Sequence, residues 1–165
     1  MIRVTLDTGI LPADDLFEAA AGRPIFFAAV SVTGRETRGT SFDVQLTPLG
    51  NVPETGVFGE SEWGSAVFAD AEAATVGLED LIQVISSGSF PPPSDRDHLT
   101  ESQRHQLRDA MILEAHAREG RDIFVSDDRR AFINHGRRAR LATLTRSDIM
   151  SREEFSAWLR SPGTA

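Results

Sequence analysis

The chain has 165 residues with a hydrophobic share of 40%, which is enough to bury a core and excludes wholesale disorder. It contains no cysteine, which excludes disulfides, thiolate zinc sites and cysteine nucleophiles. The net charge of −8 argues against a general nucleic-acid coat protein, although a local basic patch stays compatible with it. No apolar run approaches the roughly 20 residues of a membrane span, and no signal-peptide pattern opens the chain. We therefore expect a cytoplasmic protein with no membrane partner.

The first forty residues predict two strands and two helices. Residues 2–6 alternate loosely and are rich in β-formers, and residues 12–22 are typical of a helix. Residues 25–32 form a continuous run that is apolar except for Ser31, which predicts a strand buried on both faces. Thr33 and Glu36 have the spacing of a capping box, so a short helix is expected to begin there.

The middle of the chain, residues 39–99, is harder to interpret because proline and glycine interrupt it repeatedly. Within it, residues 76–85 predict a helix and residues 86–94 predict a loop. The stretch carries acids but no basic residue between Arg38 and Arg96. We expect it to be a variable, insertion-like segment that covers a site or carries a partner surface.

Regular patterning returns at Thr100. Two capping boxes predict helix starts, one from Thr100 and Gln103 and the other from Ser151 and Glu154. Gly136 is expected to break a helical stretch. The expected elements are, in order, a helix at 100–120, a strand at 122–126, a helical stretch at 129–144, a short strand at 148–150 and a closing helix.

Strands that alternate with helices predict one α/β domain over residues 1–165. Its architecture is expected to be a three-layer α/β/α sandwich with a mainly parallel central sheet. Active sites in such sheets lie at the carboxyl ends of the strands. Side chains that directly follow predicted strands are therefore the first candidates for a functional site.

Four acids fit that placement. Asp7, Glu36 and Asp128 follow predicted strands, and Asp109 can reach the same edge from its helix. Hard divalent cations such as Mg²⁺ or Mn²⁺ prefer oxygen ligands, and clustered carboxylates repel one another without a cation. Each acid also has a structural interpretation, as a turn residue, a capping residue or a solvated charge, and Asp127 competes with Asp128 for the ligand role.

Around these acids, the sequence resembles the PIN-domain nuclease family, whose prokaryotic members include toxins of toxin–antitoxin pairs. The resemblance covers roughly the first 40 and last 65 residues. The four motifs that carry it read, in chain order, VTLDTGIL, SVTGRE, RDAMILEAHA and DIFVSDDRRAF.

The resemblance implies a Mg²⁺- or Mn²⁺-dependent endoribonuclease in which the four acids bind the metal and perform catalysis. The metal ligands and catalytic residues would be Asp7, Glu36, Asp109 and Asp128. Thr8, Ser126 and Asp127 would support them. The partners implied are an RNA substrate and, for a toxin, a small antitoxin protein, with a homodimer as a further expectation. If Glu36 is not the second acid, Glu60 or Glu79 would complete the cluster.

The acid-free arginine run after the fourth acid is a candidate RNA contact, with a solvated helix face as the alternative. The arginines concerned are Arg129, Arg130, Arg137 and Arg138. The main rival function is a non-catalytic PIN-like module that binds RNA or a protein partner. Two other functions fit poorly. An aspartic protease needs two D-T-G motifs, and the chain has one. A nucleotide-binding domain needs a glycine-rich phosphate loop after the first strand, and the chain has none there.

Overall fold

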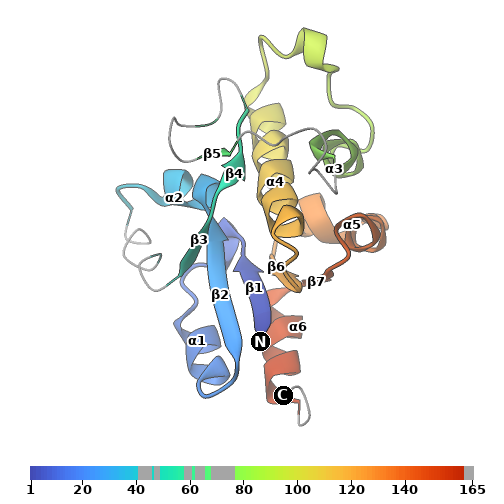
Figure 1. The fold of residues 1–165 in the computed structure, drawn as a ribbon. Helices are drawn as coiled ribbons and strands as arrows, with labels where there is room; N and C mark the ends of the chain where they lie inside the picture. Colours follow the sequence, from blue (N-terminus) through green and yellow to red (C-terminus); the bar gives the residue numbers. More distant parts are fainter. Residues whose placement is uncertain (41–45, 47–48, 58–60, 62–65, 68–76, 162–165) are drawn as a thin grey trace.

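The structure is a computed structural model that describes residues 1–40, 46, 49–57, 61, 66–67 and 77–161. Within these residues, five parallel strands form one sheet in the order β3-β2-β1-β6-β7 (Figure 1). Their bounds are Ile2–Leu6 for β1, Ile25–Val30 for β2, Gly50–Val52 for β3, Ile123–Val125 for β6 and Asp148–Met150 for β7. A separate parallel pair joins β4 (Glu54–Thr55) to β5 (Ala66–Val67).

Six α-helices are described, and they cover both faces of the sheet. They are α1 (Asp14–Ala20), α2 (Ser31–Thr37), α3 (Leu78–Ile85), α4 (Glu101–Arg118), α5 (Arg137–Thr145) and α6 (Arg152–Arg160). Single helical turns lie between β1 and α1 at Thr8–Ile10, between α3 and α4 at Pro93–Asp95, and between β6 and α5 at Arg129–Ile133. The prediction of a three-layer sandwich with a parallel sheet is confirmed.

Two apolar cores separate the layers, because successive side chains of a strand point to opposite faces. Val4 and Leu6 of β1 pack with α1 and α6 on one face. Phe124 of β6 packs with α3, α4 and α5 on the other. The alternation of apolar residues in the short strands therefore decides which helix covers which face.

The second strand is shorter and less buried than the sequence predicts. β2 ends at Val30, and residues 31–32 already belong to α2. Only its last three residues are buried, and Phe26 is 45% exposed. β3 pairs with Ala28 and the two residues after it, so the first half of β2 lies beyond its reach. The expectation of a strand buried on both faces is wrong for that half.

The elements of the second half largely follow their predicted signals. Both capping boxes are present, at the start of α4 and of α6. Gly136 adopts a left-handed conformation (φ 73°) directly before α5, which is the predicted break. Among the described helices, none is both long and apolar enough to cross a membrane.

Candidate functional site

Asp7 occupies the middle of the sheet's carboxyl edge, because it directly follows the central strand β1. It is only 6% exposed. The Thr8 amide donates to its Oδ1 at 2.8 Å, and the Ser126 hydroxyl donates to its Oδ2 at 2.6 Å. Burial raises the pKa of Asp7 to about 6, against the lowering effect of these two hydrogen bonds. Nearby Glu36 and Asp128 raise it further by charge repulsion.

Asp109 reaches the same edge from α4. Burial raises the pKa of its carboxyl to about 8, and the charges of Asp7, Asp128 and Glu36 add to the rise in that order. No hydrogen bond or ion pair within the described residues offsets this burial, in contrast to Asp7. The four acids predicted from the sequence therefore act electrostatically on one another in the fold.

Glu36 lies on α2, the helix that follows β2. Its Oε2 accepts a hydrogen bond from the Thr8 hydroxyl at 2.6 Å. The predicted capping box is wrong, because Thr33 lies inside α2 and the N-cap residue Val30 makes no side-chain cap. The Thr33 hydroxyl instead lies 3.2 Å from that of Thr8. The Thr8 hydroxyl thus connects the turn after Asp7 to two residues of α2, Glu36 and Thr33.

The neighbouring acids after β6 have different roles. The Asp128 amide donates to the Ser126 hydroxyl at 3.0 Å, and Asp128 Oδ1 caps the next turn by accepting from the Ala131 amide at 2.8 Å. Asp127 Oδ1 accepts from the Arg152 amide at 2.9 Å, at the start of α6. Asp128 is therefore both the acid of the cluster and the cap of the following turn, while Asp127 bonds to another helix.

The four candidate arginines divide into two pairs. Arg137 bonds to the Val84 carbonyl, to the Arg130 carbonyl and to the Ser87 hydroxyl, so it joins α3 to the turn before α5. Arg138 forms an ion pair with Glu154 of α6 at 2.7 Å. Arg129 and Arg130 have exposed side chains. Arg130 and Arg137 lie in the same cleft wall as Asp109 and Asp128, whereas Arg129 lines a separate hollow beside Asp127.

A cleft of about 640 Å³ adjoins the acids. Asp109 and Asp128 belong to its lining, together with Arg130. The rest of the wall is mainly polar and comes from the loop after α3, from α4 and from the start of α5. These further lining residues are Ile85, Ser86, Ser87, Ser89, Glu101, Ser102, His105, Gln106, Ala131 and Arg137. Ser86 is buried and its hydroxyl has no hydrogen-bond partner within the described residues.

The two acids named as alternatives to Glu36, and one buried histidine near the strand ends, complete the account of titratable side chains. Glu79 pairs through both oxygens with Arg96 at 2.7 Å and is absent from the charges that act on Asp7 and Asp109. Glu60, the other substitute for Glu36, lies outside the described residues. His116 is fully buried, its Nδ1 lies 2.9 Å from the Thr5 hydroxyl, and burial lowers its pKa to about 3. It is a neutral packing residue beneath the site.

The donor chemistry of the cluster fits a hard divalent cation, because the four acids supply only oxygen. A cation would also offset the charge repulsion that adds to burial in raising the pKa of Asp109. The ligand geometry is not ready-made, since no three His, Asp or Glu side chains in the described part of the chain stand where they could hold a metal. Three of the four carboxylates already accept hydrogen bonds: Asp7 from Thr8 and Ser126, Glu36 from Thr8, and Asp128 from Ala131. Binding therefore requires the carboxylates to turn toward a common point.

Comparison with models of protein families, with curated proteins and with solved structures finds no match for this chain. The sequence pattern and the geometry of the site therefore carry the functional argument.

Several residues of the site escape sequence reasoning. The sequence of the serines after α3 predicts only a loop, and nothing in that pattern relates them to acids twenty or more positions away. Gln106 and His105 carry a usable signal, because they lie three and four residues before Asp109 and so share its helix face. Ser126 and Thr8 are the supporting residues that the sequence does identify.

Proposed function

We propose that this chain is a divalent-cation-dependent endoribonuclease with a PIN-like active site. One observation carries the proposal: acids from four separate positions converge at the carboxyl ends of β1, β2 and β6, where burial and the charges of the other three raise the pKa of Asp109 to about 8. A cluster of this kind lowers the stability of the fold unless a cation joins it. The placement also matches the usual site of chemistry in parallel α/β sheets.

The residues would divide the work as follows. Asp7, Glu36, Asp109 and Asp128 would hold Mg²⁺ or Mn²⁺. When bound, such a cation lowers the pKa of water and neutralises charge that develops on a phosphate. Ser126 keeps Asp7 oriented and ionised through its 2.6 Å hydrogen bond. The Thr8 hydroxyl orients Glu36 in the same way.

The cleft beside Asp109 offers a path for a single RNA strand. Arg130 and Arg137 supply positive charge there. The Ser87 hydroxyl accepts from Arg137 and keeps its own hydrogen to donate to a phosphate or ribose oxygen. No phenylalanine or tryptophan lines the cleft within the described residues, where the imidazole of His105 is the one ring in the wall, so base stacking contributes little. We therefore expect recognition of the sugar–phosphate backbone, with weak dependence on base sequence.

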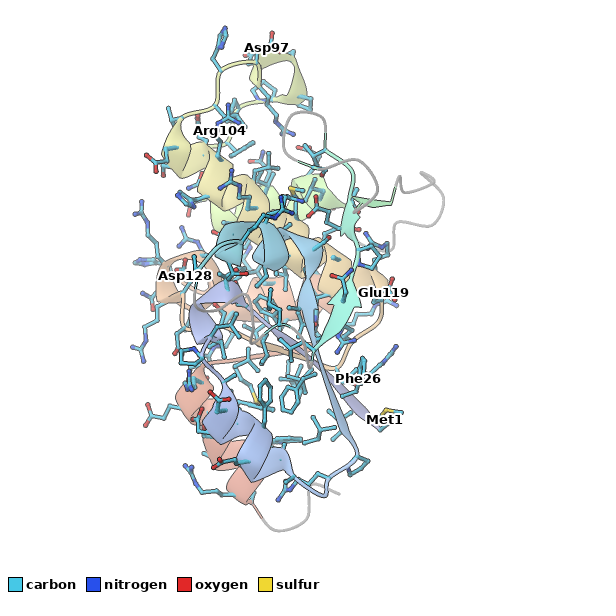
Figure 2. All side chains as sticks on the ribbon, turned by 90° about the vertical axis from the view of Figure 1, so that its left-hand side faces the viewer. Met1, Phe26, Asp97, Arg104, Glu119 and Asp128 are labelled. Carbon is cyan, nitrogen blue, oxygen red and sulfur yellow. The ribbon has the colours of Figure 1, made fainter. Side chains whose placement is uncertain are left out.

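A pooled RNA substrate tests the proposal, with wild type, Asp7→Asn and Asp109→Asn compared in Mn²⁺ and in EDTA. We expect cleavage by wild type in Mn²⁺ only, and a loss of about 100-fold or more in either variant. Asp97→Asn is the matched control, because Asp97 is exposed and well separated from Asp128 (Figure 2). Equal activity in all four proteins would point to a contaminating nuclease.

The rival function is a non-catalytic PIN-like module that binds RNA or a protein partner. The lack of a ready-made three-ligand set among the described residues favours it. Wild type that binds the RNA pool but cuts none of it in Mn²⁺ would establish this rival and exclude the nuclease.

A toxin role stays a prediction of the sequence resemblance. It requires growth arrest on expression, relieved by a small antitoxin protein. Normal growth of the native host at high expression would contradict it.

A further inference from the structure

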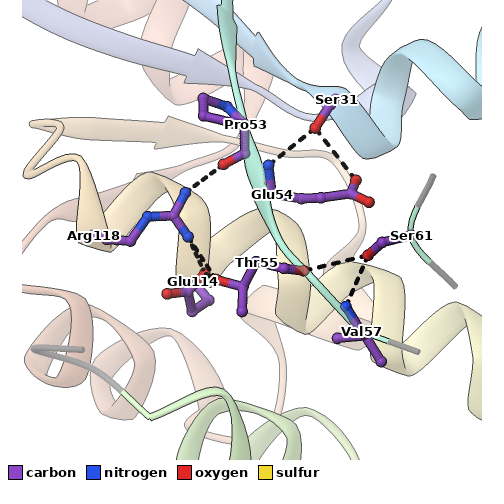
Figure 3. Close-up of polar contacts among 8 residues, drawn as sticks. All are labelled: Ser31, Pro53, Glu54, Thr55, Val57, Ser61, Glu114 and Arg118. Carbon is purple, nitrogen blue, oxygen red and sulfur yellow. Dashed lines mark hydrogen bonds and ion pairs between the residues drawn. The ribbon is translucent and has the colours of Figure 1, made fainter. Parts of the chain in front are cut away.

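The short strand β4 lies between the two helices that carry Glu36 and Asp109, and it bonds to both (Figure 3). On the α2 side, the Glu54 amide donates to the Ser31 hydroxyl at 3.0 Å, and that hydroxyl lies 3.4 Å from Glu54 Oε2. Glu54 also forms an ion pair with Arg35, the residue next to Glu36. Glu54 has no exposed surface at all.

On the α4 side, the same strand meets a second buried carboxylate. The Thr55 hydroxyl donates to Glu114 Oε2 at 2.6 Å, and Arg118 forms an ion pair with that oxygen at 2.9 Å. Arg118 also donates to the Pro53 carbonyl. Glu114 is 2% exposed and lies five residues after Asp109 on α4.

Helix α2 needs such external contacts. It has only seven residues, contains Gly34 and lacks a side-chain N-cap. Helices this short are marginal in isolation and depend on tertiary packing. The Glu54 contacts hold its first and fifth residues, Ser31 and Arg35, and so restrain the backbone immediately before Glu36.

Buried ion pairs gain little net stability over apolar packing, because desolvation of both charges offsets their attraction. One such pair, Glu54–Arg35, joins β4 to α2. The other, Glu114–Arg118, lies within α4 and holds Thr55 and Pro53 through hydrogen bonds. Two ion pairs gathered around three strand residues therefore suit a role in fixing geometry better than a role in stability alone. Side-chain networks of this kind have few alternative arrangements, since each member loses its partner when the others move.

We propose that Pro53–Thr55 is an ionic tie that sets the position of α2 relative to α4, and hence of Glu36 relative to Asp109. Glu54 and Glu114 are its positioning residues. The part of this inference that concerns cation binding rests on the proposed function, whereas the part that concerns helix position does not.

Spin labels test the helix position directly. The chain has no native cysteine, so labels at Arg38→Cys, after α2, and Glu119→Cys, after α4, report one distance. Glu54→Gln and Glu114→Gln keep side-chain size and remove the charge, and we expect each to broaden the distance distribution. Glu79→Gln is the matched control, because it breaks the Glu79–Arg96 pair outside the tie. Ser31→Ala is a milder variant that removes hydrogen bonds but no charge.

The same variants without labels, titrated with Mn²⁺, connect the tie to the site. We expect Glu54→Gln to weaken Mn²⁺ binding about 10-fold, as loss of a supporting contact does in metal sites, and Glu79→Gln to leave it unchanged. Folded Glu54→Gln, Glu114→Gln and Ser31→Ala with wild-type distance distributions would overturn the tie. Wild type that binds no Mn²⁺ would overturn the proposed function instead, and the distance measurement would still decide the tie.

Discussion

Among the four acids, Asp109 has the most strongly raised pKa. Its pKa in the fold is about 8, raised mainly by burial and then by Asp7, Asp128 and Glu36. In the unfolded chain an aspartate titrates near 3.9. The folded state therefore binds the proton more tightly than the unfolded state, so stability falls as the pH rises between these two values.

This sign gives the first prediction. Without a divalent cation, wild type should lose thermal stability from about pH 4 to pH 8, with no further loss from this group above that. Asp109→Asn removes the titrating group and should be more stable than wild type at pH 8, by about 1 kcal/mol or more, which corresponds to roughly 2–4 °C. Thermal unfolding in EDTA at several pH values measures it, with Asp97→Asn as control. A wild type that gains stability up to pH 8 relative to Asp109→Asn would contradict the assignment.

Ser126 gives the second prediction, because its hydroxyl donates to Asp7 and accepts from the Asp128 amide. Ser126→Ala removes a hydrogen bond that lowers the pKa of Asp7. The ionised carboxylate then becomes less available, and Mn²⁺ affinity should fall about 10-fold. Ser126→Thr keeps the hydroxyl and should stay within a few-fold of wild type. Isothermal titration with Mn²⁺ decides the matter, and equal affinity of the alanine and threonine variants would refute the role of the hydroxyl.

At the scale of elements, Gly136 separates the turn at Arg129–Ile133 from α5. Its φ of 73° lies in the left-handed region, although a Cβ there would meet no atom within 4 Å. Strain of the backbone, without any steric clash, should therefore make Gly136→Ala less stable by about 1 kcal/mol. Gly136→Asn should cost less, because asparagine tolerates this conformation better. Urea unfolding compares the two, and an alanine variant as stable as wild type would refute the explanation.

The elements that the sequence predicts well are those with local signals. The capping boxes at Thr100 and Ser151, and the glycine before α5, each act through atoms within a few residues. β3 and β4 could not be predicted in this way. They are two or three residues long and exist because distant residues pair with them: Ala28 and the two residues after it pair with β3, and β5 pairs with β4.

The residues of the site likewise separate into those that local sequence patterns predict and those that depend on long-range contacts. Asp7 and Asp128 follow strands whose apolar pattern is plain, so their meeting at one sheet edge follows from the parallel order alone. The role of Thr33 could not be foreseen, since the capping-box spacing pointed to a local partner. In the fold, its hydroxyl lies beside Thr8, twenty-five residues earlier. Long-range pairs of this kind depend on the whole packing arrangement.

At the scale of the whole molecule, the helices on the two faces of the sheet have different roles. Helices α1 and α6 cover one face and complete an apolar core, while α4 on the other face brings Asp109 to the strand ends. Met1 and Phe26, the large apolar side chains most exposed in the described residues, lie apart from Asp128 in Figure 2. The four acids of the candidate site lie at one edge of the sheet, in a chain whose net charge is −8.

A cation that binds only the folded chain raises its stability by mass action, by about 2.7 kcal/mol when its concentration is 100 times the dissociation constant. Wild type at pH 8 should therefore show a higher melting temperature in saturating Mn²⁺ than in EDTA. Asp7→Asn should show little of this gain. An equal gain in both proteins would place the cation elsewhere on the acidic surface.

The most direct test of the central claim is Mn²⁺ binding by wild type, Asp109→Asn and Asp97→Asn at pH 8, with free Mn²⁺ followed by electron paramagnetic resonance. The account predicts at least one bound Mn²⁺ in wild type and in Asp97→Asn, and affinity at least about 10-fold weaker in Asp109→Asn. Equal affinity in all three proteins, or no binding by wild type, would contradict it.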